Sequence, residues 1–318
     1  MIALLAPGQG SQTPGMLSPW LEQPGAASQL AAWSEISGLD LVALGTTATA
    51  EEITDTTVTQ PLVVAATLLA YNELSQRRNS PLGEDVIVAG HSVGEIAAYA
   101  IAGVISPDDA VMLAATRGRE MAKACALEPT GMAAVLGGDE TEVLTRLEQL
   151  DLVPANRNAV GQIVAAGLVT ALDKLAEDPP AKARVRKLAT AGAFHTQFMA
   201  PALEAYSAAA GQVAASDPAA TLLSNRDGQP VTSAAAAMEN LVAQLTRPVR
   251  WDLCTETLRA RDVSAIVEFP PAGTLAGIAK RELRGTPTHA VKSPADLDGL
   301  PEFQPFSSPL QPAQPDTQ

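Results

Sequence analysis

The chain has 318 residues, of which 47% are hydrophobic and 18% charged, a balance typical of a globular protein with a substantial core. Its 35 acidic residues outnumber its 21 basic residues, which gives a formal net charge of −14, and only 3% of its residues are aromatic. An acidic chain with few aromatic rings lacks the basic surface that binds phosphate, so this composition argues against a nucleic-acid-binding protein.

The sequence carries no signal for a membrane, secretion or a metal. Polar residues interrupt every apolar run, and the apolar start ends at Pro7 without the basic segment of a signal peptide. Cys125 and Cys254 are far apart and outside any CxxC pattern, so we expect reduced thiols in a cytoplasmic protein. No metal-ligand spacing relates the three histidines, which are His91, His195 and His289.

The first third of the chain alternates between predicted strands and helices. Residues 1–7 (MIALLAP) and 85–92 (DVIVAGHS) are short apolar runs typical of buried strands, and residues 60–74 between them are typical of a buried helix. A further helix is predicted over 106–124, because Ser106 can act as the N-cap and Pro107 and two aspartates follow it. This alternation predicts a parallel sheet with helices on both faces.

The pattern then changes to a β-α-β-β-α-β order, which is that of a ferredoxin-like unit. The predicted elements are strands over 131–137, 152–158, 161–167 and 182–190 and helices over 139–150 and 170–180. We therefore expect a subdomain over 127–190, inserted into a large α/β domain formed by 1–126 and 191–292. The large domain resumes with a loop and helix over 191–213, a strand over 265–271 and a helix over 274–283. Proline-rich residues 293–318 are expected to be a disordered tail.

Residues 90–94 read Gly-His-Ser-Val-Gly at the predicted junction of a strand and a helix. This G-x-S-x-G pattern is typical of a nucleophile elbow, in which glycines relieve crowding around a strained turn that lifts the serine out of the sheet. The N-terminus of the following helix points free N–H groups at whatever the serine attacks. The alternative is a glycine-rich loop in which Ser92 is merely the N-cap of the helix.

Three further positions are candidates for the same site. The segment PGQGSQ has no G-K-[ST] and lacks the third glycine of a dinucleotide fingerprint, so it is either an ordinary turn or places Gln9 beside Ser92. His195 lies in a loop where the large domain resumes, and we favour it over a structural histidine because Ser92 needs a base. Arg117 is either a surface ion pair or a guanidinium that grips a carboxylate in a cleft.

Six motifs in order now point to a known family: GQGSQ, GHSVGE, TRGREM, NAVGQIVAAG, GAFHT and PVRWD. From Ile2 to about Leu283 the sequence resembles malonyl-CoA:acyl carrier protein transacylases of type II fatty acid synthesis. The resemblance implies an α/β-hydrolase-like parallel-sheet core with an inserted ferredoxin-like subdomain. It also implies a ping-pong transfer of malonyl through an ester of Ser92 to the phosphopantetheine thiol of acyl carrier protein.

The resemblance also implies the roles of individual residues. His195 would be the base, Arg117 would bind the malonate carboxylate, and the N–H groups of Gln9 and Val93 would form the oxyanion hole. A polar family residue that lines the site matches Asn158. Where many members have Gln, this chain has Arg250, whose main-chain carbonyl would orient His195. Phe194 goes with malonyl rather than methylmalonyl, because it fills the space that the extra methyl group would need.

The same resemblance implies malonyl-CoA and acyl carrier protein as partners and a CoA thioester as substrate. We further expect no permanently bound cofactor and a monomer. Because acyl carrier proteins are acidic, docking on this acidic chain needs a local basic patch, and residues 182–187 (KARVRK) and 280–284 (KRELR) are candidates, with ordinary solvated charge as the alternative for each. Two other functions compete with this one. A serine hydrolase would want an acidic partner for a histidine near the C-terminus, and a non-catalytic carrier-binding protein would not need both Ser92 and His195.

Overall fold

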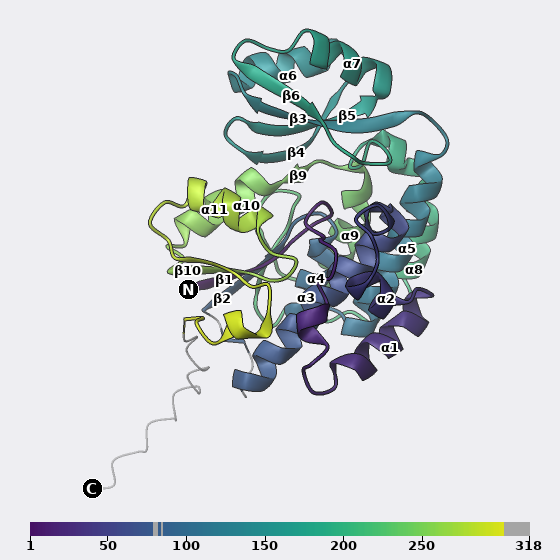
Figure 1. Ribbon diagram of the computed structural model, residues 1–318. Helices are drawn as coiled ribbons and strands as arrows, with labels where there is room; N and C mark the ends of the chain where they lie inside the picture. Colours follow the sequence, from purple (N-terminus) through teal and green to yellow (C-terminus); the bar gives the residue numbers. More distant parts are fainter. Residues whose placement is uncertain (79–81, 84, 302–318) are drawn as a thin grey trace, which may run out of the picture.

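The computed structural model describes residues 1–78, 82–83 and 85–301. Figure 1 shows two units: a large one built around a parallel sheet, and a smaller one that lies beyond its upper end in that view. Across the described part of the chain, no helix combines the length and the apolar character that crossing a bilayer requires.

The sheet of the large unit has the strand order β11-β10-β1-β2-β7-β8. Its neighbouring strands are parallel except for β8, which pairs with β7 in the antiparallel sense. All residues of β1 and β2 are buried, as expected for strands that are covered on both faces. The bounds are β1 Ile2–Ala6, β2 Val86–Gly90, β7 Thr221–Leu223, β8 Pro230–Val231, β10 Ala265–Glu268 and β11 Thr288–Ala290.

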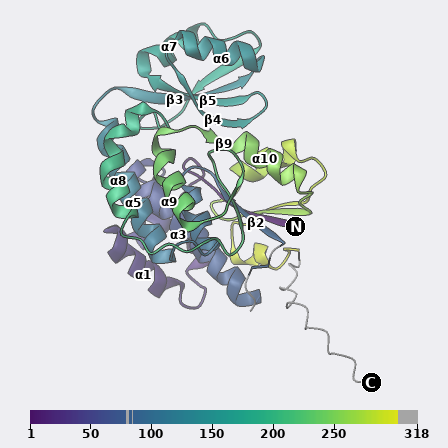
Figure 2. The ribbon, with the colours of Figure 1, turned by 180° about the vertical axis from the view of Figure 1, so that it is seen from behind.

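Helices cover both faces of this sheet, which confirms the expected layered α/β arrangement (Figures 1 and 2). Ile2 and Leu4 point into one core, and Ala3 and Leu5 point into the other, because side chains alternate along a strand. The helices of the first core are α1 Ala26–Ser37, α2 Leu41–Thr46, α3 Thr56–Arg78, α4 Gly94–Ile101, α5 Pro107–Cys125, α8 Leu203–Ala210 and α9 Ala234–Ala243. Those of the second are α10 Trp251–Ala260 and α11 Thr274–Glu282.

Helix α5 begins as the sequence predicts. The Ser106 hydroxyl accepts a hydrogen bond from the Asp109 N–H at 3.0 Å, and Pro107 occupies the first helical position. Short 3-10 turns lie at Ser18–Trp20, Glu52–Thr54, Gln197–Ala202, Gln244–Thr246 and Pro294–Leu297.

The smaller unit follows the predicted β-α-β-β-α-β order element by element. Its neighbours in the order β6-β3-β5-β4 are all antiparallel, and α6 and α7 contribute to a separate core with Val135 and Ile163. Its bounds are β3 Thr130–Gly137, α6 Glu140–Gln149, β4 Val153–Ala159, β5 Gln162–Leu168, α7 Val169–Glu177 and β6 Ala183–Lys187. We keep 127–190 as the proposed extent of this unit.

A fifth strand joins this smaller sheet, and the sequence did not predict it. Strand β9, Val249–Arg250, pairs in parallel with Asn156 and Arg157 of β4. Two residues are too short to give a periodic signal, so only the pairing itself reveals the strand. The segment that follows the 3-10 turn at residues 244–246 is therefore attached to both units.

The expectation of disorder over 293–318 is wrong for its first part, residues 293–301. Ser293 and Asp296 form a capping box for the turn at Pro294–Leu297, and Leu297 is buried in the first core. Asp298 also forms an ion pair with Arg77 at the end of α3. Pro294 begins a turn that buries the apolar side chain of Leu297. This burial favours an ordered turn although the proline-rich composition predicts disorder. The rest of the predicted tail, residues 302–318, lies outside the described residues.

Candidate active site

Ser92 lies on a sharp turn between β2 and α4 and has the left-handed backbone conformation, with φ 54°. A Cβ atom at Gly90 would overlap the main chain of Gly94, and one at Gly94 would overlap the main chain of Ala6. Only glycine fits at these two positions, because neighbouring main-chain segments approach them too closely for a side chain. The turn has the geometry predicted for a nucleophile elbow, and the hydroxyl of Ser92 faces a histidine and not the first turn of α4.

Asn225 holds the strained elbow from two sides. Its Oδ1 accepts a hydrogen bond from the Ser92 N–H at 2.8 Å, and its Nδ2 donates to the Gly90 carbonyl at 2.6 Å. Asn225 is fully buried, so these hydrogen bonds are not exchanged for water. They offset the cost of the left-handed conformation at Ser92.

The structure brings together the predicted pair of Ser92 and His195. Nε2 of His195 lies 2.7 Å from Oγ of Ser92, and Nδ1 lies 2.8 Å from the main-chain carbonyl of Gln244. A carbonyl oxygen only accepts hydrogen bonds, so Nδ1 carries the proton and Nε2 is left to accept the proton of Ser92. Burial, and then the positive charge of Arg117, lower the pKa of His195 to about 3, which keeps the imidazole neutral near pH 7.

The expectation that Arg250 orients the base is wrong. The carbonyl that holds His195 belongs to Gln244, at the start of the 3-10 turn Gln244–Thr246. Arg250 lies instead on β9, where its guanidinium pairs with Asp252 at 2.8 Å. The motif PVRW, residues 248–251, thus follows Gln244 closely in the sequence, but its residues connect the two units and do not hydrogen-bond with the imidazole of His195.

Arg117 is a buried cation that lies beside Ser92. Its side chain is only 2% exposed, and its Nη2 lies 3.5 Å from Oγ of Ser92. Nη1 donates to Oε1 of Gln60 at 2.8 Å, and Nη2 donates to Oε1 of Gln244 at 2.9 Å. Both acceptors are neutral amides, so the surface ion pair considered from the sequence is wrong. Burial lowers the pKa of Arg117 to about 10, at which the guanidinium is still charged at pH 7.

Gly118 explains how Arg117 and Gln60 come within reach of each other. A Cβ atom at Gly118 would lie 2.7 Å from the carbonyl oxygen of Thr56, at the start of α3. The glycine thus lets α5 approach α3 closely, and Gln60, one turn further along α3, reaches the guanidinium. The pair Arg-Gly in the sequence is a packing requirement of the site.

The remaining predicted residues surround the elbow. Asn158 of β4 hydrogen-bonds through Oδ1 with Nε2 of His91 at 2.8 Å, and the His91 ring meets Trp251 edge-on. The ring of His91 thus contacts Asn158 and Trp251 and forms no hydrogen bond with Ser92 or His195. The loop that carries Gln9 lies against the elbow, since a Cβ atom at Gly8 would be 2.7 Å from the His91 carbonyl.

Val93 and Phe194 are both buried next to the reacting residues. Val93 immediately precedes α4, so its N–H is among the helix donors that lack an intrahelical acceptor. Phe194 is 6% exposed and belongs to the first core.

Sequence reasoning missed four buried polar residues of this site: Gln60, Glu95, Asn225 and Gln244. Gln60 begins the segment predicted as a buried helix, and Glu95 directly follows the elbow glycine, so a polar residue at a position expected to be buried was an available signal. Asn225 and Gln244 lie in segments without such a pattern.

Comparison with known proteins places this site in a family. The family described as acyl transferase domain matches residues 4–298. The malonyl CoA-acyl carrier protein transacylase of Mycobacterium tuberculosis (strain ATCC 25618 / H37Rv) is 78% identical over 300 residues, covering 94% of this chain and 99% of that protein. The chain belongs to the malonyl CoA-acyl carrier protein transacylases.

Solved structures agree with this membership. The crystal structure of MCAT from Mycobacterium tuberculosis has a TM-score of 0.91 and 78% identity, and the match covers 93% of this chain and 98% of that chain. A structure of a type II PKS acyl-carrier protein in complex with its malonyl-transacylase gives a TM-score of 0.87 at 29% identity, covering 93% of this chain and 97% of that chain.

Replacing Arg250 by Ala should leave the rate of Ser92 acylation within about twofold, because the substitution removes only a partly exposed ion pair with Asp252. Replacing His195 by Ala should lower that rate by roughly 10²–10⁴, as expected for a lost general base. Rapid-quench mass spectrometry of the acylated protein measures both. A loss of more than about tenfold in Arg250→Ala would mean that residue 250 acts on the base after all.

Proposed function

We propose that this chain transfers malonyl from malonyl-CoA to the phosphopantetheine thiol of acyl carrier protein, through an ester on Ser92. The observation that carries the proposal is the combination of a Ser92–His195 hydrogen bond with a buried, unpaired guanidinium 3.5 Å from the same hydroxyl. A serine–histidine pair suits acyl transfer, and a cation beside it suits an acyl group that ends in a carboxylate. CoA thioester is the substrate, with no permanently bound cofactor.

In the first half-reaction the malonyl carboxylate binds Arg117. As Oγ of Ser92 attacks the thioester carbon, Nε2 of His195 takes the hydroxyl proton. The main-chain N–H groups of Gln9 and Val93 donate to the oxyanion, and one such donor contributes about 10²–10³ in rate. The tetrahedral intermediate expels the CoA sulfur, and His195 returns the proton to it, so that free CoA thiol leaves.

In the second half-reaction the phosphopantetheine thiol gives its proton to His195 and attacks the malonyl ester. The C–O bond to Ser92 breaks, and His195 returns the proton to Oγ. Water competes with the thiol as an acceptor, so the ester must lie where water cannot approach it well. The burial of His195 and Arg117, which both lie within 3.5 Å of the hydroxyl, supports that requirement.

In this proposal Phe194 favours malonyl over methylmalonyl, because its side chain would fill the space that the extra methyl group needs. A clash of one methyl group discriminates by only about 1–3 kcal/mol, so a methyl-bearing substrate still reacts slowly. The proposal includes a monomer in the cytoplasm, and both Cys125 and Cys254 are free thiols, as a reducing compartment would keep them.

Brief mixing with malonyl-CoA should give a malonyl-sized mass increase on the intact protein and none on Ser92→Ala, because the ester needs Oγ. Adding acyl carrier protein should discharge the adduct. An adduct that drains to water regardless of carrier would instead indicate a hydrolase. Carrier binding without any adduct would indicate a non-catalytic carrier-binding protein.

Replacing Arg117 by Ala should slow acylation by malonyl-CoA far more than acylation by acetyl-CoA, since only malonyl carries the carboxylate that the guanidinium binds. Loss of one hydrogen-bonded charge partner corresponds to roughly tenfold or more. The two acylation rates can be compared by mass spectrometry of the Ser92 adduct. An equal loss with both substrates would exclude a carboxylate-binding role.

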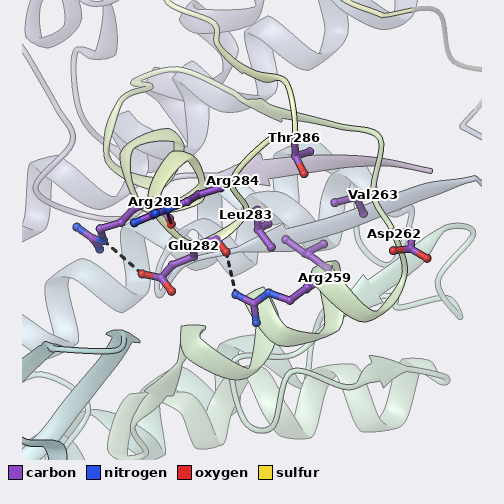
Figure 3. Close-up of a pocket in the computed structure, with 9 residues that line it drawn as sticks. Arg259, Asp262, Val263, Arg281, Glu282, Leu283, Arg284 and Thr286 are labelled. Atoms are coloured by element: carbon purple, nitrogen blue, oxygen red, sulfur yellow. Dashed lines mark hydrogen bonds and ion pairs between the residues drawn. The ribbon is translucent and has the colours of Figure 1, made fainter.

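Carrier docking is proposed for one of two basic segments. Arg184 and Arg186 are exposed on β6, the edge strand of the smaller sheet, whose end leads to the loop of His195. The other segment lines a cavity of about 540 Å³ between α10 and α11 (Figure 3). There Arg281 pairs with Glu282 and also donates to Gln162 in the smaller unit.

Charge reversal should identify the docking segment. Arg184→Glu with Arg186→Glu, or Lys280→Glu with Arg281→Glu, should raise the KM for acyl carrier protein and leave that for malonyl-CoA nearly unchanged, because only the carrier is large and acidic enough to meet the patch. Each pair is the matched control for the other in steady-state kinetics. Unchanged carrier KM in both pairs would place docking elsewhere.

A further inference from the structure

One residue, Gln244, contacts all three groups that the proposed reaction uses. Its main-chain carbonyl accepts the His195 Nδ1 proton at 2.8 Å, and its side-chain Oε1 accepts from Arg117 Nη2 at 2.9 Å. Its Nε2 donates to the main-chain carbonyl of Ser92 at 3.1 Å. The base, the guanidinium and the nucleophile are thus positioned relative to one another by a single glutamine.

The amide of Gln244 also meets a carboxylate that the reaction does not use. Glu95, in the first turn of α4, is 1% exposed, and its Oε2 accepts a hydrogen bond from Nε2 of Gln244. Its other oxygen, Oε1, accepts from the main-chain N–H of Asn225 at 2.7 Å. Asn225 is the residue that holds the Ser92 elbow, so Glu95 connects the two supports of the site.

These partners allow the Gln244 amide only one orientation. Arg117 has donors only, so it needs the amide oxygen, and an ionised carboxylate accepts only, so it needs the amide nitrogen. Turning the amide over would place nitrogen against guanidinium and oxygen against carboxylate, which leaves two buried charged groups without their hydrogen bonds. Glu95 and Arg117 therefore fix the amide from opposite ends.

We infer that Glu95 is a positioning residue for the malonyl-binding guanidinium: its carboxylate holds the Gln244 amide so that the oxygen faces Arg117. With Glu95 neutral, Nε2 of Gln244 keeps the Ser92 carbonyl as an acceptor but loses its charged partner, so the amide oxygen is held less firmly against Arg117. The guanidinium then binds the malonyl carboxylate less well, whereas an acetyl group, which has no carboxylate, is affected little. This inference rests on the proposed role of Arg117.

The ionisation of Glu95 makes the effect depend on pH. Burial raises the pKa of Glu95 to about 7, so its charge changes between pH 6 and 8. His195, with a pKa of about 3, stays neutral over that range. Two charged groups interact with Glu95: Arg117 of α5, whose pKa is about 10, and Asp227. The remaining titratable groups around it are Tyr99 of α4, Tyr206 of α8 and Cys254 of α10, and the pKa of each of these is raised.

A raised pKa also means that ionised Glu95 does not stabilise the fold. Because the folded state favours the protonated carboxyl, its contribution to the free energy of unfolding decreases as the pH rises from about 4.5 through about 7. At pH 8 the buried charge therefore costs stability, which fits a residue that serves the site.

The test is Ser92 acylation by Glu95→Gln, measured by intact mass spectrometry over a range of malonyl-CoA and acetyl-CoA concentrations. At pH 8 the half-saturating malonyl-CoA concentration should rise by about tenfold, as for one lost hydrogen bond to a charged group, and that for acetyl-CoA should stay within about twofold. In the unmodified protein the half-saturating malonyl-CoA concentration should rise as the pH falls from 8 to 6. In Glu95→Gln it should not change with pH over that range. The same pH series with acetyl-CoA measures any effect of titrating the CoA phosphates, because both substrates carry them.

Glu268→Gln is the matched control, since Glu268 is also fully buried but accepts hydrogen bonds from the first turn of α11. It should leave the malonyl-to-acetyl ratio unchanged. Gln244→Met keeps the main-chain carbonyl and removes the amide, so it should raise the half-saturating concentration of malonyl-CoA and not that of acetyl-CoA. This variant tests the inference if Glu95→Gln does not fold.

Equal effects of Glu95→Gln on both substrates, or a Gln244→Met protein with an unchanged ratio, would overturn the positioning role of Glu95. Arg117→Ala separates this from a failure of the proposed function. If Arg117→Ala is selective for malonyl and Glu95→Gln is not, only the inference about Glu95 falls. If Arg117→Ala is not selective, the carboxylate-binding role of Arg117 falls with it.

Discussion

The site depends on one close approach, in which the start of α4 lies directly against the end of β1. Gly94 has no side chain, so its Cα can meet the main chain of Ala6 and Pro7. This contact places the N-terminus of α4 against the end of β1, and the chain between them passes through Ser92 in the left-handed region, where Asn225 holds it. It also brings the loop after β1, and with it Gln9, to the same edge. Nucleophile, helix donors and loop are thus assembled by a single packing constraint.

A buried positive charge governs the chemistry at that edge. Nη1 and Nη2 of Arg117 donate to the neutral amides of Gln60 and Gln244, which accept these hydrogen bonds without carrying a negative charge, and Nε is buried without a hydrogen-bond partner among the described residues. The same charge helps to lower the pKa of His195 and so keeps the base unprotonated. In the proposed reaction, a malonyl carboxylate bound to Arg117 would offset the positive charge of the guanidinium and so raise the basicity of His195. An arginine already paired with a carboxylate would neither lower the pKa of His195 in this way nor change its net charge so much when a second carboxylate binds.

Much of this arrangement could be predicted from the sequence, and the reasons are local. Strands β1 and β2 are short apolar runs bounded by turn residues, the start of α5 has a complete capping signal, and the smaller unit follows a recognisable order of elements. Ser92, His195 and Arg117 stand in distinctive motifs. The carbonyl that orients His195 could not be assigned this way, because any residue supplies a carbonyl and only the 3-10 turn at residues 244–246 decides which one points at the ring. Strand β9 and the ordered turn at Pro294–Leu297 likewise depend on partners distant in the sequence.

The pairing of β9 with β4 makes the geometry of the base sensitive to the separation of the two units. Gln244 holds His195, and Val249, five residues later, is hydrogen-bonded into the smaller sheet. Five residues of chain span at most roughly 17 Å, and the 3-10 turn uses part of that length. The intervening segment is therefore a short tether. A rigid-body displacement of the smaller unit would therefore pull on this segment and shift the imidazole of His195.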